Sequence, residues 1–239
     1  MTLTRIRSEL YKAAVEGDFN KFIINHQSLD LLQLLTPNKN TILHIHLTST
    51  STATKTARRI INIPKRLISL ITRTETTPAP AVSERFVEQI LDESGSLAFF
   101  QNSKGETPLH VAAMYGHSAV VKLLLERAKR VNGGAERELS RARTRENDET
   151  AVHLAVRHNH VEAVEILLET DREAFNLANK AKETPLYLAS ERNYSEIVSK
   201  IVECVESPAY EGPRNRTALH AAVINHDPEL DMEIRKSWS

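Results

Sequence analysis

Apolar residues recur along the chain with the three-and-four spacing of helices that bury one face. Residues 109–113 are apolar and mostly small, which predicts a helix that approaches a neighbour closely. A second apolar stripe follows at 120–125, and related stripes return at 163–168 and 197–202. The pattern therefore predicts repeated pairs of short helices rather than strands.

Each first helix of a pair begins with a variant of the tetrapeptide Thr-Pro-Leu-His. A threonine hydroxyl can cap a helix, and a proline in the first turn lacks only an N–H that would be unpaired there. The gaps between successive threonines are 66, 43, 34 and 33 residues, so the later units share one period and the earlier ones carry extra residues. The threonines are Thr41, Thr107, Thr150, Thr184 and Thr217.

Nine residues after each of the last four threonines stands a residue type that ends helices at positive φ. These residues are Gly116, Asn159, Asn193 and His226. A helix pair of this size cannot cover both of its apolar faces by itself, whereas stacked copies cover one another. The sequence therefore predicts a stack of repeats.

The motif and its period resemble the ankyrin repeat, whose signature is Thr-Pro-Leu-His-x-Ala at about 33 residues. The resemblance implies an all-α fold: an ankyrin-repeat solenoid of helix–turn–helix units joined by hairpin loops. It also implies that each motif histidine bonds the capping threonine and neighbouring backbone. The histidines concerned are His44, His110, His153 and His220, with Tyr187 at the equivalent place in one repeat.

Several segments resemble more narrowly the plant ankyrin-repeat proteins of the accelerated-cell-death type. They are residues 10–22, 35–49, 182–198 and 207–223. This resemblance implies a role in plant defence or stress signalling and a cytoplasmic location for this chain. Full-length relatives are expected to be membrane-anchored, with the repeats facing the cytosol, through a carboxyl-terminal domain absent here.

The motif positions predict six segments. They are a capping repeat at 1–36, a repeat at 37–101 with an insertion at about 50–82, a repeat at 102–144 with an extended loop at 130–146, repeats at 145–178 and 179–211, and a partial or capping repeat at 212–239. The last segment is interpreted either as a polar end cap or as the end of a truncated product.

The insertion contains a basic amphipathic stretch at 57–73. One interpretation is a helix that binds a membrane surface or an acidic partner. The other is a disordered insertion, because Pro64 interrupts the apolar face. A membrane-peripheral regulatory module that uses this stretch is therefore the alternative function.

Composition excludes several classes of protein. The 31 basic and 31 acidic residues balance, with a basic front (eleven against four over residues 1–74), so a general nucleic-acid binder is not expected. Cys204 is the single cysteine, which excludes an internal disulfide. No run of 18 apolar residues predicts a membrane span. His158 and His160 are candidates for a metal pair, but residues two apart on a helix face different ways, so no metal is predicted.

No motif for hydrolase, phosphate-binding or zinc-protease chemistry occurs, so we expect neither an enzyme nor a cofactor. The expected function is a non-enzymatic scaffold that binds another protein or peptide on the concave face of the repeats. The family's usual contact positions place the following residues there: Ser103, Lys104, Glu106, Met114, Tyr115, Glu146, Asn147, Glu149, Arg157, His158, Lys180, Glu183, Glu191, Arg192, Arg214 and Arg216.

Overall fold

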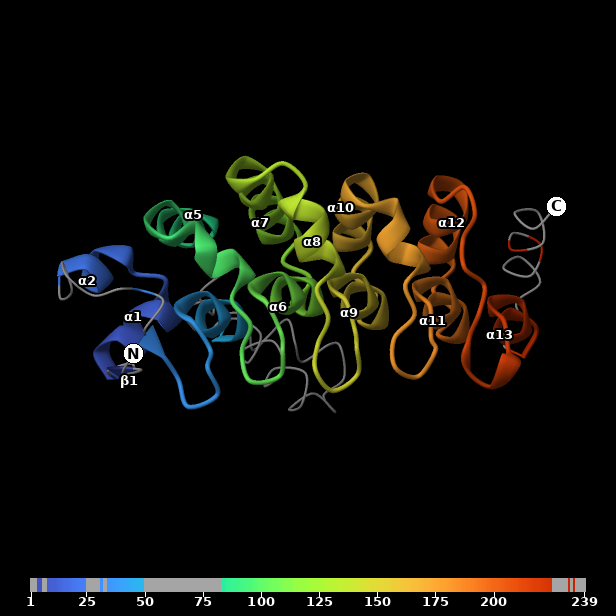
Figure 1. Ribbon diagram of the computed structural model, residues 1–239, viewed down its shortest axis with the longest axis horizontal. Helices are drawn as coiled ribbons and strands as arrows, with labels where there is room; N and C mark the ends of the chain where they lie inside the picture. The colour runs from blue at the N-terminus through green and yellow to red at the C-terminus, as the bar shows by residue number, and fades with distance from the viewer. Residues whose placement is uncertain are drawn as a thin grey trace, which may run out of the picture. The chain divides into compact units, whose positions relative to one another are not determined.

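A computed structural model describes residues 4–5, 8–24, 31, 34–49, 83–224, 232 and 234. The chain forms two compact units, residues 1–94 and 95–239, and each is described by itself. Both are built of short helices, as predicted for an all-α ankyrin solenoid (Figure 1). The predicted insertion at 50–82 and the stretch at 57–73 lie outside the described residues, as does the predicted turn residue His226.

The first unit consists of helices and one short pair of strands. Strands β1 and β2 are parallel, with Thr4 opposite Leu34 and Arg5 opposite Leu35. The sequence pattern did not predict this pair. The elements are β1 (Thr4–Arg5), α1 (Ser8–Glu16), α2 (Phe19–Ile24), β2 (Leu34–Leu35), a helix at 42–49 and α5 (Glu84–Glu93).

His46 joins three parts of the first unit. One ring nitrogen, Nδ1, lies 2.8 Å from the Ala14 carbonyl oxygen in α1, and Nε2 accepts from the Ser83 N–H at 3.0 Å. The ring also packs on Phe86, with centroids 4.7 Å apart. Because the side chain is fully buried, these bonds replace its lost hydration.

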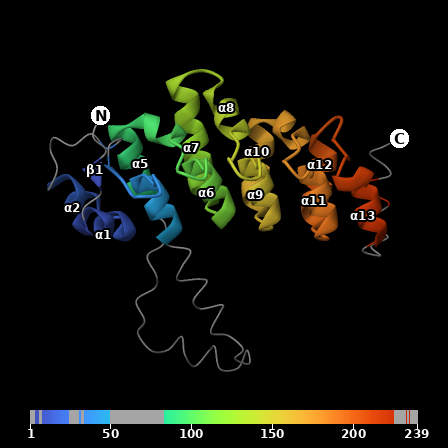
Figure 2. The same ribbon diagram turned by 60° about the horizontal axis from the view of Figure 1, so that its bottom comes forward.

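The second unit contains two rows of helices. Contacts between neighbours join α6, α9, α11 and α13 in one row and α7, α10 and α12 in the other, as Figure 2 shows. The elements of the first row are α6 (Pro108–Tyr115), α9 (Ala151–Arg157), α11 (Pro185–Glu191) and α13 (Ala218–Ile224). The others are η2 (Gly95–Phe99), α7 (Ser118–Val131), α8 (Ala135–Arg141), α10 (Val161–Thr170), η3 (Arg172–Asn176), α12 (Ser195–Cys204) and η4 (Pro213–Asn215).

The core lies between the two rows. The predicted stripe of each second helix is buried, as at Leu124, Leu167 and Ile201. First-row helices carry small side chains such as Ala112 and Ala155, which are also fully buried. Small residues let neighbouring first helices approach closely, and the larger second-row residues fill the space between the rows.

The ends of the first helices have the predicted chemistry. Thr107 caps α6, and Pro108 occupies its first turn. Gly116 ends it at φ 72°, and Asn159 and Asn193 stand at φ 57° and 58° in the next two repeats. Positive φ is permitted to glycine and tolerated by asparagine, so these three residues suit the backbone conformation they adopt.

The segment predicted as an extended loop at 130–146 contains helical residues. Helix α7 continues to Val131, and α8 then covers seven residues. Arg141 at the end of α8 donates two hydrogen bonds to the Asp171 carboxylate, at 2.5 and 2.8 Å. Asp171 is nearly buried, and it belongs to the following repeat. The connection is therefore held to the next repeat by a bidentate ion pair.

Tyr187 replaces the motif histidine in one repeat, and the neighbouring backbone is adapted to it. A Cβ atom added to Gly212 would lie 2.1 Å from Cδ2 of the Tyr187 ring. Gly212 has φ −143°, a conformation open to any residue. Glycine is therefore required here only because a larger residue would clash with the Tyr187 ring. Tyr187 can thus occupy the motif position because Gly212 has no side chain.

We expect Gly212→Ala to lower the free energy of unfolding by about 1–3 kcal/mol, because the added methyl group overpacks against Tyr187. Urea unfolding monitored by circular dichroism would measure it. Gly133→Ala is the matched control, since nothing lies within 4 Å of that Cβ. Adding Tyr187→His to Gly212→Ala should recover part of the loss, and no recovery would show that the ring is not the cause.

Candidate protein-interaction face

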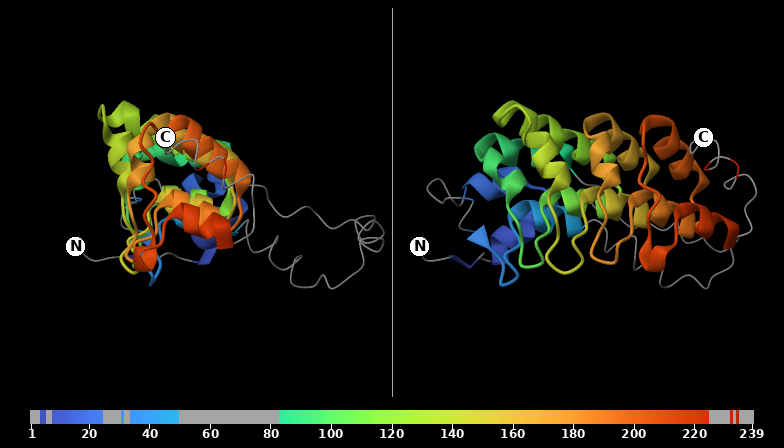
Figure 3. Two further views of the ribbon diagram at one scale, coloured as in Figure 1. Left: turned by 90° about the vertical axis from the view of Figure 1, so that its right-hand side faces the viewer. Right: turned by 45° about the vertical axis from the view of Figure 1, so that its right-hand side comes forward.

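The hairpin loops that precede the first helices lie on one side of the second unit (Figure 3). We call their outermost residues the hairpin tips: 103–105, 145–148, 180–182 and 213–216. Two of these loops are built alike. The Asn102 side-chain oxygen accepts the N–H groups of Lys104 and Glu106, at 2.9 and 3.0 Å. Asn179 makes the same pair of bonds to the N–H groups of Ala181 and Glu183.

The loop before α9 is closed by a hydroxyl. Thr144 accepts the Glu149 N–H on its side-chain oxygen at 3.0 Å, and its carbonyl accepts the Asp148 N–H at 3.2 Å. Side-chain acceptors of this kind stabilise tight turns. Each of these three loops therefore has an internal brace, and side chains at its tip, such as Lys104, Arg145 and Lys180, stay exposed.

Neighbouring hairpin tips are joined through the backbone. The Arg145 N–H donates to the Lys104 carbonyl at 2.8 Å, and the Lys180 N–H donates to the Asn147 carbonyl at 2.9 Å. These bonds hold three consecutive tips in register. The side chains of the tips stand on a shared, ordered edge rather than on independent loops.

The motif histidines anchor the hairpins from below. In the repeat that begins at Thr107, the His110 Nδ1 atom accepts the Thr107 N–H at 3.1 Å and lies 2.8 Å from its hydroxyl. Because Nδ1 accepts, the proton is on Nε2, which donates to the carbonyls of Ala142 and Glu149 at 3.0 and 3.2 Å. The ring thus connects one helix start to the next hairpin.

The other motif residues repeat this arrangement or replace it. His153 bonds Thr150 in the same way, and its Nε2 atom lies 3.2 Å from the Glu183 carbonyl. Where Tyr187 stands instead, the Thr184 hydroxyl itself donates to the carbonyls of Ala209 and Glu211, at 3.0 and 2.9 Å. The structural role implied by the ankyrin resemblance is confirmed for these histidines.

Arg157 lies at the end of α9 between two carboxylates. It donates to Glu149 at 2.9 Å through Nε, with a second, shorter bond through Nη2, and to Glu183 at 3.2 Å. Glu149 is 6% exposed. Burial lowers the pKa of Arg157, but Glu149 and Glu183 outweigh it, so that the pKa is raised. The Arg157 guanidinium is therefore already paired within the chain.

The residues predicted to face a partner divide into two groups. Glu149 is buried, and Arg157 and Glu183 are engaged with each other, so these three form the base of the face. Glu106, Met114 and Tyr115 are half-buried. The remaining predicted residues are exposed: Ser103, Lys104, Glu146, Asn147, His158, Lys180, Glu191, Arg192, Arg214 and Arg216. The sequence-based set did not include Arg145 and Lys182, although both are exposed in the same tips.

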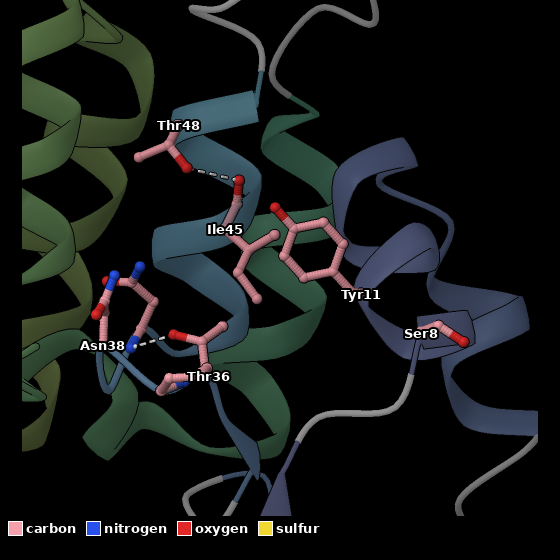
Figure 4. A pocket seen from close by; sticks show the side chains of 8 residues that line it. Ser8, Tyr11, Thr36, Asn38, Ile45 and Thr48 are labelled. Carbon is pink, nitrogen blue, oxygen red and sulfur yellow. Dashed lines mark hydrogen bonds between the residues drawn. The ribbon is translucent and has the colours of Figure 1, made fainter.

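The first unit carries a hollow that the sequence did not indicate (Figure 4). It is lined by uncharged residues of α1, the 36–40 turn and the helix at 42–49. Tyr11 borders it and is 48% exposed. Tertiary packing of three segments makes this hollow, and no local motif marks it. Its lining is Ser8, Tyr11, Thr36, Pro37, Asn38, Asn40, Ile45 and Thr48.

The two histidines considered as a metal pair, His158 and His160, make contacts within the fold. His158 and His160 stack with ring centroids 6.2 Å apart, and the His160 Nε2 atom lies 3.1 Å from the Met114 carbonyl oxygen. Within the described ranges, no three metal-ligating side chains converge. Cys204 is half-buried at the end of α12. None of the described helices has the length and apolar character needed to cross a bilayer.

The sequence was compared with protein families and curated proteins. A family model described as ankyrin repeats (3 copies) matches residues 80–176 and 129–209, which together span 130 of the 239 residues. The chain belongs to the ankyrin-repeat family. The search of curated proteins found no match.

Solved structures, two of them of ankyrin repeat proteins by description, share the fold at low sequence identity. The human ASB11 ankyrin repeat domain has a TM-score of 0.64 and 21% identity, with 98% of this chain and 85% of that chain covered. The ankyrin repeat protein EF0377 gives 0.68 and 18%, with 95% and 96% covered. A chain from the complex of the Bdellovibrio bacteriovorus predatory endopeptidase Bd0816 with immunity protein Bd3460 gives 0.67 and 17%, with 97% and 98% covered.

Burial lowers the pKa of His153 to about 4, while the Glu183 carbonyl opposes that shift and the nearby Arg143 and Arg157 add to it. The unfolded chain takes up this proton near pH 6.5, whereas the folded chain stays neutral until about pH 4. Stability from this residue is therefore complete above pH 6.5 and is lost as the pH falls toward 4.

We expect the change from pH 7.5 to pH 5 to remove about 2 kcal/mol of unfolding free energy through His153. Urea unfolding at the two pH values measures the total change. The variant His153→Gln should be less stable at pH 7.5 but should show a pH dependence smaller by about that amount. An equal pH dependence in the variant and the wild type would contradict the assignment.

Arg157→Ala should destabilise the fold by about 2–3 kcal/mol, because it leaves the buried Glu149 carboxylate without its cation. Arg143→Ala removes a more exposed pair with Asp148 and should cost no more than about 1 kcal/mol. Thermal and urea unfolding of both variants measure the difference. If the two losses were equal, Arg157 would not have the proposed role at the base of the face.

Proposed function

We propose that this chain is a non-enzymatic scaffold that binds another protein through the hairpin tips and first-helix ends of residues 95–239. Ankyrin repeats generally mediate protein–protein interaction, and stacked repeats create extended binding surfaces. The observation that carries the proposal is the division between base and tips. Polar groups at the base bond one another across repeats, and the tips present exposed side chains on a backbone held in register.

Rigidity is the physical reason that such a face can bind. Ordering a loop on binding costs free energy, whereas loops that are already braced lose less freedom. The bonds from Asn102, Thr144 and Asn179 supply this bracing before any partner arrives. Half-buried Tyr115 adds an aromatic side chain at the far end of α6, of the kind that anchors protein partners.

We further propose that the partner belongs to plant defence or stress signalling in the cytoplasm. The support for this is the resemblance of residues 10–22, 35–49, 182–198 and 207–223 to the accelerated-cell-death type. The alternative of a membrane-peripheral module rests on residues 57–73, which lie outside the described part of the chain.

A triple variant, Tyr115→Ala, His158→Ala and Arg192→Ala, tests the face. These side chains lie at the ends of the first helices and make no part of the Arg157 network. We expect the variant to lose proteins that the wild type captures from a plant cell extract, with quantification by mass spectrometry. Arg157→Glu is unsuitable for this test, because it would place a third negative charge beside Glu149 and Glu183.

The matched control is Glu126→Ala, Glu169→Ala and Glu203→Ala, three exposed positions on the second helices. It should keep the captured proteins, and both variants should keep the melting temperature of the wild type. If the face variant captured the same proteins as the wild type, the interface would have to lie elsewhere.

A further inference from the structure

The hairpin tips of the second unit are rich in exposed cations. Each tip carries at least one, and the last two tips carry two each. Among the described residues, none of these cations forms an ion pair with a carboxylate. They are Lys104, Arg145, Lys180, Lys182, Arg214 and Arg216.

The carboxylates of the same loops are arranged differently. At the base, Glu149 and Glu183 are held by Arg157, and Glu106 accepts from the Asn102 amide at 2.8 Å. Two exposed acids, Glu146 and Glu211, have no such partner among the described residues. A third, Asp148, is paired with Arg143 at 3.5 Å.

The outward charge of the tips is therefore positive. Six exposed cations in the tips stand against three exposed acids, when Glu211 just before the last tip is counted with Glu146 and Asp148, which gives a net charge of +3. The excess is greatest over the last two tips, which carry four cations and contain no acid, with Glu211 exposed just before the last tip. Charge segregated in this way favours a partner of opposite sign and speeds its approach.

The spacing of the cations limits the shape of that partner. Neighbouring tips follow the spacing of packed helices, about 10 Å. An extended peptide advances about 3.3 Å per residue, so every third residue would meet a new tip. Each tip carries one or two cations, so the positive charge is spread along the row of tips. This arrangement fits a ligand with single negative charges along its length better than a ligand with one doubly charged group.

We propose that the tips bind an extended, carboxylate-rich segment of the partner, with Asp or Glu near every third position. This inference rests on the proposed function and names the chemistry of its ligand. Lys104, Lys180 and Lys182 contact carboxylates of the segment, and Arg145, Arg214 and Arg216 extend the same positive edge. The base of the face takes no part, because its charges are already paired.

The probe is a fluorescent 15-residue peptide, Glu-Gly-Ser repeated five times, with Gln-Gly-Ser repeated five times as the neutral match. Anisotropy titration of the full chain should give binding of the glutamate peptide at least about tenfold tighter than that of the neutral one. Raising the salt to about 0.5 M should weaken it by about tenfold, since these charges are exposed.

The variant Lys104→Glu, Lys180→Glu and Lys182→Glu should reduce affinity for the glutamate peptide by at least about tenfold. The control Lys122→Glu, Lys129→Glu and Arg130→Glu reverses three exposed cations of α7, with the same change in net charge. It should change the affinity by less than about threefold, and circular dichroism should show both variants folded.

Equal binding of the two peptides would overturn the inference, and so would equal loss in the two variants, which would reveal a response to net charge alone. If the glutamate peptide failed to bind while the Tyr115, His158 and Arg192 variant still lost its captured proteins, the acidic ligand would be wrong and the scaffold function would stand.

Discussion

The fold depends on one hydrogen-bonded contact: a buried imidazole that bonds its own helix start with Nδ1 and the next hairpin with Nε2. In the repeat that begins at Thr107, this contact pairs the buried Thr107 N–H and reaches the carbonyls of Ala142 and Glu149 in the connection to the next repeat. The side chain that starts one helix therefore also sets the place of the following loop.

The repeat at Tyr187 shows how this constraint can be met by other chemistry. The Thr184 hydroxyl donates directly to the next loop, and Gly212 leaves room for the ring. The requirement is a donor that reaches the neighbouring carbonyls, and the described repeats meet it with a histidine ring or with a threonine hydroxyl. Arg141, at the end of α8, supplies a comparable cross-repeat contact by bonding Asp171, which follows α10.

The proposed binding role depends on which polar groups are already hydrogen-bonded within the chain. Because Asn102, Thr144, Asn179 and Arg157 satisfy the polar groups at the base, the tips are ordered without the help of a partner. Their exposed side chains can differ from repeat to repeat at little cost in stability. The positive edge from Lys104 to Arg216 is a property of this sequence on a fold that leaves those positions open.

The sequence by itself determined the helix starts at the five threonines, the helix ends at Gly116, Asn159 and Asn193, the buried stripes and the stacked all-α fold. These follow from local backbone chemistry and from a period that repeats, so neighbouring residues suffice to predict them. Only the tertiary structure decided that Arg157 lies between Glu149 and Glu183, that α8 docks on Asp171, and that Tyr11 borders a hollow. Each of these joins residues from different turns or repeats, and whether a charge is buried or exposed depends on partners that sequence spacing does not identify.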